Sequence, residues 1–319
     1  MAGRIRLLLM LGLVALALGF APHQVAAAGG KLRFVFVSHA PNSDPWWNTV
    51  KTGIRVAAQQ MDVTVQYRNP PNGDIATMAR LIDQAAASNP DGIISTIADY
   101  DVLKTPLSNA VRRGIPVITV NSGTPAQSQA IGALMHIGQP DYTAGLLAGE
   151  RAKQAGIKSF LCVNHYITNP ASVQRCEGFA KGLGVALGHQ MIDSGTDPTV
   201  VENKVEAYLR ANPKTEAVLA LGPLSAIPTI AALKSIHLAG HIYFGTFDLS
   251  PEIVTAIKDG VIQWAIDQQP YLQGYLPVVF LANYDRYGVL PANKVMLTGP
   301  SFVTKANVAL VEKYAGTYR

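Results

Sequence analysis

The sequence predicts an α/β fold of two similar lobes, each a parallel sheet covered by helices. The chain has 319 residues and is 49% hydrophobic, which allows two domains with cores and excludes a disordered or fibrous chain. After residue 30, short β-branched and aromatic runs alternate with stretches of helical periodicity. A Gly/Ser/Gln-rich stretch at residues 121–132 separates two such series. Strands that alternate with helices imply right-handed crossovers and a parallel sheet covered on both faces.

Residues 1–28 have the layout of a cleavable secretory signal peptide. Arg4 and Arg6 precede an apolar run from Leu7 to Phe20, and three alanines at 26–28 follow it. A membrane helix needs about 20 apolar residues. We therefore favour a signal peptide over an N-terminal anchor and expect the mature chain to be periplasmic.

The first series predicts one lobe. Its strands are expected at residues 33–38, 63–67, 92–96 and 115–121. Helices with one apolar face are expected at 47–61, 75–82 and 103–111. Gly114 ends the last of these helices.

The second series predicts the other lobe. It begins with Asp141 as the N-cap of a helix that ends at Gly156. Strands are expected at 159–163, near 191, and at 217–221, 242–246 and 261–266, and helices at 173–179, 201–209, 227–233 and 251–258. The chain should then cross back through a helix at 271–283, kinked by Pro277. The lobes are thus expected at 31–138 plus 269–290 and at 139–268 plus 291–319.

Charge and cysteine content narrow the class of protein. The formal charge is +5, and loss of the signal peptide removes two positive charges. Without a Lys/Arg cluster, the mature chain offers no electrostatic support for a nucleic-acid partner. Cys162 and Cys176 both lie in the exported part. In an oxidising compartment they can form a disulfide, and two separate buried thiols are the alternative.

The sharpest candidate for ligand binding is the pair Trp46 and Trp47. In open parallel sheets, ligands bind beyond the carboxyl ends of the strands, and this pair follows the first strand. With Asp44 as N-cap and Pro45 as the first helical residue, the two indoles point about 100° apart. Trp47 then faces the core and Trp46 the strand ends, where an aromatic face suits the apolar face of a sugar ring. Packing of both against loops is the alternative.

Other polar side chains occupy or follow strand ends. They are Asp99, Asn121, Asp248 and Gln268. Each has paired hydrogen-bonding capacity, although a turn role is an equal alternative for Asn121 and Asp248. Arg175 offers a planar fork of donors, but a lone arginine is by default on the surface.

The sequence carries no strong catalytic or metal-binding motif. It contains no G-x-S-x-G, H-E-x-x-H, C-x-x-C or G-x-x-x-x-G-K-[ST] pattern. We therefore expect neither an enzyme, nor a metal site, nor a cofactor.

A set of ordered motifs resembles the ribose-type periplasmic sugar-binding proteins of bacterial ABC importers. The motifs are N-S-D-P-W-W-N-T-V-K-x-G at 42–53, P-D-G-I-I-S-T at 90–96, G-I-P-V-I-T-V-N-S-G at 114–123, R-C-E-G-F at 175–179, G-T-F-D at 245–248 and D-Q-Q-P at 267–270. The resemblance implies the type I periplasmic binding protein fold, two Rossmann-like lobes joined by three hinge strands that close on one small carbohydrate.

The resemblance also implies roles for individual residues. The stacking aromatics correspond to Trp46 and Trp47, and the hydroxyl-binding residues to Asp44, Asn121, Arg175, Asp248 and Gln268. Three departures argue against ribose itself: Thr96 in place of an Asn, Asn121-Ser122 in place of Asp-Arg, and Gly222-Pro223 in place of an Asn.

The function predicted on these grounds is that of a receptor for a monosaccharide, polyol or amino sugar that delivers its ligand to an ABC permease. We expect a monomer whose partners are the carbohydrate and the permease. A sensory receptor that partners a chemoreceptor or sensor kinase, for a sugar or a furanosyl quorum signal, is the main alternative. A periplasmic carbohydrate-active enzyme is a further one and requires a carboxylate pair at hydrolytic spacing.

Overall fold

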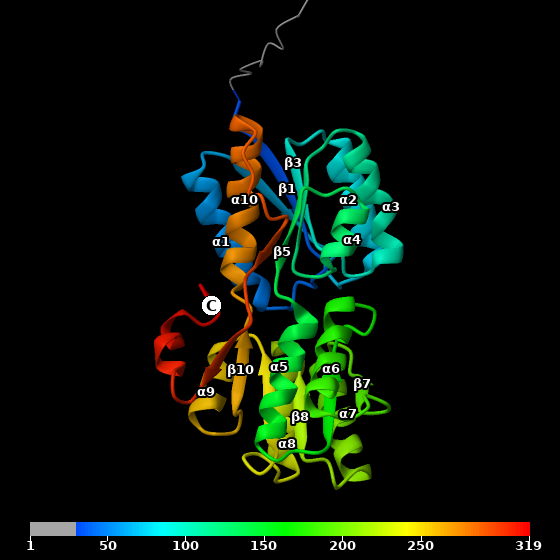
Figure 1. Ribbon diagram of the computed structural model, residues 1–319, viewed down its shortest axis with the longest axis vertical. Helices are drawn as coiled ribbons and strands as arrows, with labels where there is room; N and C mark the ends of the chain where they lie inside the picture. The colour runs from blue at the N-terminus through cyan, green and yellow to red at the C-terminus, as the bar shows by residue number, and fades with distance from the viewer. Residues whose placement is uncertain (1–29) are drawn as a thin grey trace, which may run out of the picture. The chain divides into compact units, whose positions relative to one another are not determined.

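The computed structural model describes residues 30–319, and the predicted signal peptide lies outside them. Two six-stranded sheets form the framework (Figure 1). The first has the order β11-β5-β4-β3-β1-β2, and all its pairs are parallel. The second has the order β12-β10-β9-β8-β6-β7, in which only β12 runs antiparallel to its neighbour. The predicted α/β class with two lobes is confirmed.

The strands are short, at three to five residues each. The first sheet contains β1 (Arg33–Val37), β2 (Thr64–Arg68), β3 (Gly92–Ser95), β4 (Val117–Val120), β5 (Met135–Gly138) and β11 (Val295–Leu297). The second contains β6 (Phe160–Asn164), β7 (Met191–Asp193), β8 (Ala217–Ala220), β9 (Tyr243–Phe247), β10 (Trp264–Asp267) and β12 (Ser301–Thr304).

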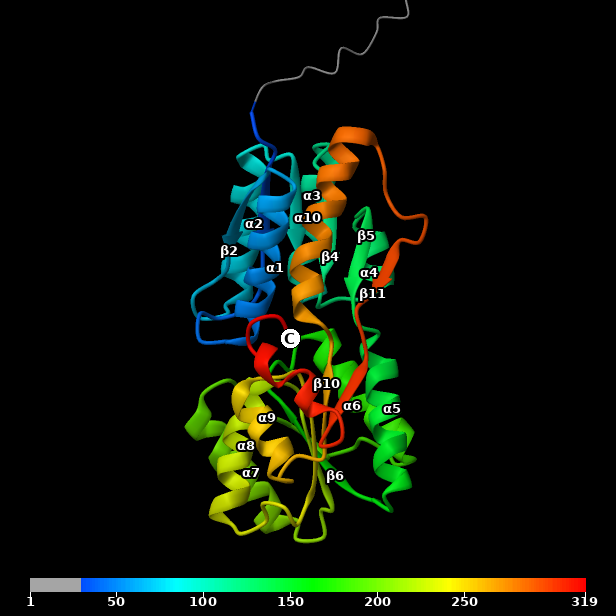
Figure 2. The ribbon, with the colours of Figure 1, turned by 90° about the vertical axis from the view of Figure 1, so that its left-hand side faces the viewer.

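Helices cover both faces of each sheet. The first lobe contains α1 (Trp46–Gln60), α2 (Ile75–Ala87), α3 (Tyr100–Arg112), α4 (Pro125–Ala130) and α10 (Pro270–Tyr287). The second contains α5 (Asp141–Gln154), α6 (Pro170–Leu183), α7 (Pro198–Ala211), α8 (Pro223–Ser235) and α9 (Pro251–Lys258), with short 3₁₀ turns at Val308–Leu310 and Glu312–Tyr314. In the first lobe α1 and α10 lie side by side on one face (Figure 2), and α2 and α3 cover the other.

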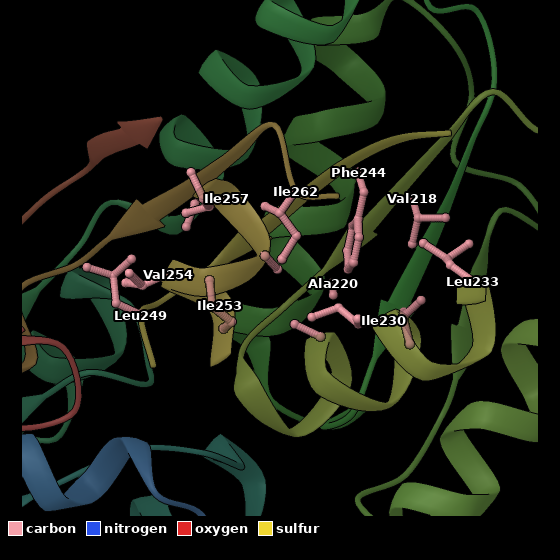
Figure 3. Close-up of a cluster of buried hydrophobic side chains, with 14 of the residues drawn as sticks. Val218, Ala220, Ile230, Leu233, Phe244, Leu249, Ile253, Val254, Ile257 and Ile262 are labelled. Carbon is pink, nitrogen blue, oxygen red and sulfur yellow. The ribbon is translucent and has the colours of Figure 1, made fainter. Parts of the chain in front are cut away.

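Each face of each sheet has its own apolar core. Figure 3 shows one of them in the second lobe, where Val218 and Phe244 of the sheet meet Leu233 of α8 and Ile257 of α9. These side chains are essentially inaccessible to solvent. Burial of this kind is the main stabilising term for each lobe.

Some elements differ from the sequence-based expectation. The elements β5, β11, β12 and α4 were not predicted. The three strands have only three or four residues, too few to show a clear alternation, and α4 lies in the Gly/Ser/Gln-rich stretch that separates the two series. Pro277 lies inside α10, which continues to Tyr287. Asp141 is the first residue of α5 and not its N-cap, which is Pro140.

The chain passes between the lobes three times, at residues 139–140, 268–269 and 298–300. The third passage corrects the expected domain division, which placed residues 291–319 in the second lobe. The strand β11 pairs with β5, so residues 295–297 belong to the first sheet. Within residues 30–319, no helix has the length and apolar character that crossing a bilayer requires.

The helices α5 and α6 pack with their backbones in contact through glycines. A Cβ atom on Gly145 would lie 2.3 Å from the carbonyl oxygen of Arg175, and one on Gly149 would lie 2.1 Å from that of Phe179. No side chain fits at such distances, so glycine is required at both positions. This close approach fixes α6 relative to the first passage between the lobes, because α5 begins at that passage.

Candidate ligand-binding site

A pocket lies between the carboxyl ends of the strands of the two sheets. It is lined by His39, Asp44, Trp46, Trp47, Asn121, Ser122, His165, Tyr166, Asn169, Ala171, Ser172, Arg175, Leu221, Gly222, Pro223, Leu224, Asp248 and Gln268. Both lobes and one passage between them contribute. Its position is typical of a small-molecule site in an α/β protein.

The pocket brings together every predicted site residue except Asp99. Asp99 instead caps α3, where its Oδ1 atom accepts a hydrogen bond of 3.1 Å from the backbone N–H of Val102. The carboxylate is therefore committed to the helix end. For the residues that do line the pocket, contact with a ligand remains a prediction.

The two tryptophans form one wall of the pocket. Their ring centroids lie 4.9 Å apart at an interplanar angle of 75°. Trp46 is 6% exposed and Trp47 is 2% exposed, and both belong to the apolar core around Phe36. The expectation that only Trp47 joins the core is therefore wrong, because the first turn of α1 lies at the boundary between core and pocket. The buried indole N–H of Trp46 makes no hydrogen bond of good geometry among residues 30–319, although it lies close enough to the Asp248 carboxyl to oppose the rise in the pKa of that group.

Asp44 stands at the entrance to α1 without being its N-cap, which is Pro45. Its Oδ1 atom accepts a hydrogen bond of 3.1 Å from the backbone N–H of Trp46. Its Oδ2 atom accepts one of 3.4 Å from the hydroxyl of Tyr166, which belongs to the other lobe. Both carboxylate oxygens thus have protein donors.

Arg175 is buried, so the default of a surface arginine does not apply. Its Nε atom donates to Asp141 Oδ1 at 2.7 Å, and Nη1 donates to the carbonyl oxygen of Leu221 at 3.0 Å. The guanidinium also lies 4.4 Å from the ring centroid of Phe247. Its charge is balanced and its orientation fixed before any ligand is considered.

A hydrogen-bond network links the pocket to the second passage between the lobes. Gln268 Nε2 donates to Asp248 Oδ1 at 2.8 Å, and Asn121 Nδ2 donates to Gln268 Oε1 at 3.3 Å. Asn121 and Asp248 have φ values of 61° and 66°, in the left-handed region that short polar residues tolerate best. These two residues therefore occupy turn positions and line the pocket at once.

Several lining residues were not predicted as site residues. They are His39, Ser122, His165, Tyr166, Asn169, Ala171, Ser172, Leu221, Gly222, Pro223 and Leu224. The rule that directed attention to strand ends would have found His165 to Asn169, since this segment follows β6 directly. No local pattern marked Ser172, which depends on where α6 lies.

Burial controls the charge of the pocket. It raises the pKa of Asp44 to about 6 and that of Asp248 to about 7, with the nearby Arg175 guanidinium opposing the rise for Asp248. It lowers the pKa of His39 and of His165 to about 3, and Arg175 adds to both shifts. The two imidazoles are therefore neutral at pH 7.

The arrangement can hold a ring with apolar faces and polar edges. Indole surfaces line one wall, and neutral imidazoles, carboxyls, amides and one guanidinium surround the rest. Among residues 30–319, no group of three His, Cys, Asp or Glu side chains is placed to hold a metal ion.

Two α/β lobes joined by three passages, with a polar pocket at the facing strand ends, define a class of protein that closes on a small ligand. The family model described as "periplasmic binding protein domain" matches residues 34–285. The chain belongs to this family and has the type I periplasmic binding protein fold.

Several known proteins are similar to this chain. A xylose/arabinose-binding protein, XylF, of Sulfolobus acidocaldarius is 27% identical over 325 residues, which cover 94% of this chain and 80% of that protein. The ribose import binding protein RbsB of Haemophilus influenzae is 26% identical over 74% of this chain and 80% of its own length. A solved carbohydrate transporter from Acidothermus cellulolyticus 11B, in complex with myo-inositol, is 34% identical with a TM-score of 0.83, covering 90% of this chain and 99% of that one.

Proposed function

We propose that the mature chain is a periplasmic receptor that traps one small carbohydrate, polyol or amino sugar between its lobes and delivers it to an ABC permease. The observation that carries this proposal is the pocket itself, in which two tryptophans and a ring of buried polar groups face each other across the lobes. Aromatic surfaces suit the apolar face of a sugar ring, and the polar groups suit its hydroxyls. The names of the similar proteins point to the same ligand class.

Specificity would come from the buried polar groups. A ligand that fails to bond the Trp46 N–H leaves that donor unpaired in a buried site, which costs free energy. The same holds for the guanidinium hydrogens of Arg175 that the protein does not use. Sites of this kind reject close analogues strongly.

The departures from the ribose-binding pattern support a ligand other than ribose. Thr96 bonds the ring of His39 at 3.0 Å and does not line the pocket. Gly222 has no side chain, and a Cβ there would come within 3.4 Å of both Asp248 Oδ2 and His165 Cε1. The missing side chain gives a ligand access to these two residues. We therefore expect a polyhydroxylated ligand other than ribose to bind more tightly than ribose.

Thermal unfolding and titration calorimetry with a defined panel test the function. The panel contains myo-inositol, D-xylose, L-arabinose, D-ribose, D-glucose, D-galactosamine and mannitol. A ligand at 100 times its dissociation constant should add about 2.7 kcal/mol to the free energy of unfolding. Trp46 and Trp47 should also report binding by a change in intrinsic fluorescence. No response to any member would overturn the carbohydrate assignment.

Delivery to a permease is tested in cells that lack the chain. Uptake of the radiolabelled ligand should fall and should return when the gene is restored. A changed sensory response with normal uptake would favour the sensory alternative. Conversion of the bound sugar during incubation with the purified protein would instead favour an enzyme.

A further inference from the structure

We propose that Tyr166 and Asn169 hold the two lobes together and set ligand affinity by stabilising the closed form, without themselves needing to contact the ligand. They are positioning residues for the pocket. The part of this proposal that concerns affinity rests on the proposed function, whereas the part that concerns lobe closure does not.

The first bridge joins Asn169 to Ser122. Asn169 Nδ2 donates to Ser122 Oγ at 2.8 Å, and both side chains are buried. Each is oriented by its own lobe: Asn169 Oδ1 accepts the backbone N–H of Ala171 at the start of α6, and the Ser122 hydroxyl donates to Asn121 Oδ1. The bridge thus forms between two groups that are already aimed at each other.

The second bridge joins Tyr166 to Asp44. The Tyr166 hydroxyl donates to Asp44 Oδ2 at 3.4 Å, and the tyrosine ring lies edge-on to His39 with centroids 5.3 Å apart. The backbone N–H of Tyr166 donates to Asn164 Oδ1 at 2.9 Å, which fixes the turn after β6. Asp44 Oδ1 accepts from the backbone N–H of Trp46 in its own lobe, so Oδ2 is the oxygen that contacts the other lobe.

Both bridges exist only while the lobes are closed, so they act on the closed fraction. The apparent affinity falls in proportion to the fraction of molecules that are competent to bind. One hydrogen bond changes an equilibrium constant by about 2- to 12-fold. Loss of both bridges should therefore reduce the ratio of closed to open molecules, and with it the affinity, by about 5- to 100-fold.

The test uses Tyr166→Phe and Ser122→Ala, alone and combined, because each removes one hydroxyl and keeps the pocket walls. Tyr142→Phe is the matched control, since this tyrosine lies exposed on α5. Spin labels on ketone-bearing residues at exposed Ala87 and Lys234, one in each lobe, leave the cysteines untouched. Electron–electron resonance distances without added sugar should shift toward the open form in the double variant and stay unchanged in the control. An unchanged distance distribution in the double variant would overturn the proposal, whatever the ligand is.

Kinetics with myo-inositol as the probe give the second readout. Stopped-flow tryptophan fluorescence should show a dissociation rate raised by about 5- to 100-fold in the double variant, with the association rate within a factor of about 2. A lower association rate with unchanged dissociation would contradict the bridges. If myo-inositol does not bind the wild-type chain, the proposed ligand class is at fault, and the distance measurement still decides the role of the bridges.

Discussion

Arg175 Nε donates to Asp141 Oδ1 at 2.7 Å, and this buried ion pair joins the pocket to the first passage between the lobes. Asp141 begins α5 directly after that passage, and Gln139 Nε2 within the passage also donates to Asp141 Oδ1, at 3.0 Å. The close backbone contact between α5 and α6 holds the two charged groups at a fixed separation. The orientation of the pocket arginine is thus set by a residue that does not line the pocket.

We predict that Asp141→Ala lowers the free energy of unfolding by about 3–5 kcal/mol, because it leaves the buried guanidinium without its counter-charge. Asp141→Asn should lose less, since it retains an acceptor for Arg175 Nε. Urea unfolding followed by circular dichroism measures both. Asp101→Ala, which breaks the exposed pair with Lys104, is the control and should change stability little. Equal losses for Asp141→Ala and Asp101→Ala would show that the buried pair has no special role.

Trp46→Phe should weaken ligand binding by about 2- to 12-fold, in addition to the loss of stability expected when a buried side chain becomes smaller. An aromatic ring remains, but the indole N–H that makes no well-formed hydrogen bond within residues 30–319 is lost, and one hydrogen bond to a neutral ligand is worth about this factor. Calorimetric titration with the tightest member of the sugar panel measures it. Trp264→Phe is the matched control, because its indole N–H bonds Tyr243 inside the second lobe. That variant should lose stability and keep its affinity; the reverse pattern would return Trp46 to a purely structural role.

The residues at the strand ends are the part of the pocket lining whose position the sequence predicted well. Asn121 and Asp248 follow short apolar strands directly, so their place at the sheet edge depends only on local structure. The Arg175–Asp141 pair could not be predicted in this way. Its members lie 34 residues apart, and their contact depends on the glycine-mediated packing of α5 against α6.

The fold likewise has elements that depend only on local sequence and elements that depend on distant segments of the chain. Strands with a run of β-branched and aromatic residues, such as β1 and β4, were recognised close to their true bounds. The strands β5, β11 and β12 depend for their identity on partners far along the chain, because their own sequences contain polar residues or are only three or four residues long. Position in a sheet that other segments build is not encoded locally.

The disulfide should contribute about 3 kcal/mol to stability. Cys162 of β6 and Cys176 of α6 are bonded, with a sequence separation of 14, and closing a loop of this length restricts the unfolded chain by about that amount. The pairing also ties the helix that carries Arg175 to its neighbouring strand. The double variant Cys162→Ala/Cys176→Ala should therefore show a lower free energy of unfolding, measured in urea. A reducing agent should destabilise the wild-type chain and leave this variant unaffected; equal sensitivity of the two would contradict the assignment.

The buried carboxyl of Asp248 should make stability depend on pH. Burial raises its pKa from 3.8 to about 7, so between these values the folded chain binds more protons than the unfolded chain. By linkage, this group makes the free energy of unfolding fall as the pH rises from about 4 to about 7. Asp248→Asn removes the titration and keeps an acceptor for Gln268 Nε2.

As the pH rises across this window, Asp248→Asn should therefore become more stable relative to the wild type. The free energy of unfolding of the variant minus that of the wild type should increase by at most about 1.4 kcal/mol per pH unit. The lowered pKa values of His39 and His165 have the opposite effect on the free energy of unfolding, because the stability that these groups contribute is lost as the pH falls below 6.5. The wild type and the variant both contain these histidines, so their effect cancels in the difference. Urea unfolding at half-unit steps from pH 4 to pH 8 measures the difference. Asp99→Asn removes the same charge outside the pocket and retains a good helix cap. If the two variants gave the same pH dependence, burial of Asp248 would not be its cause.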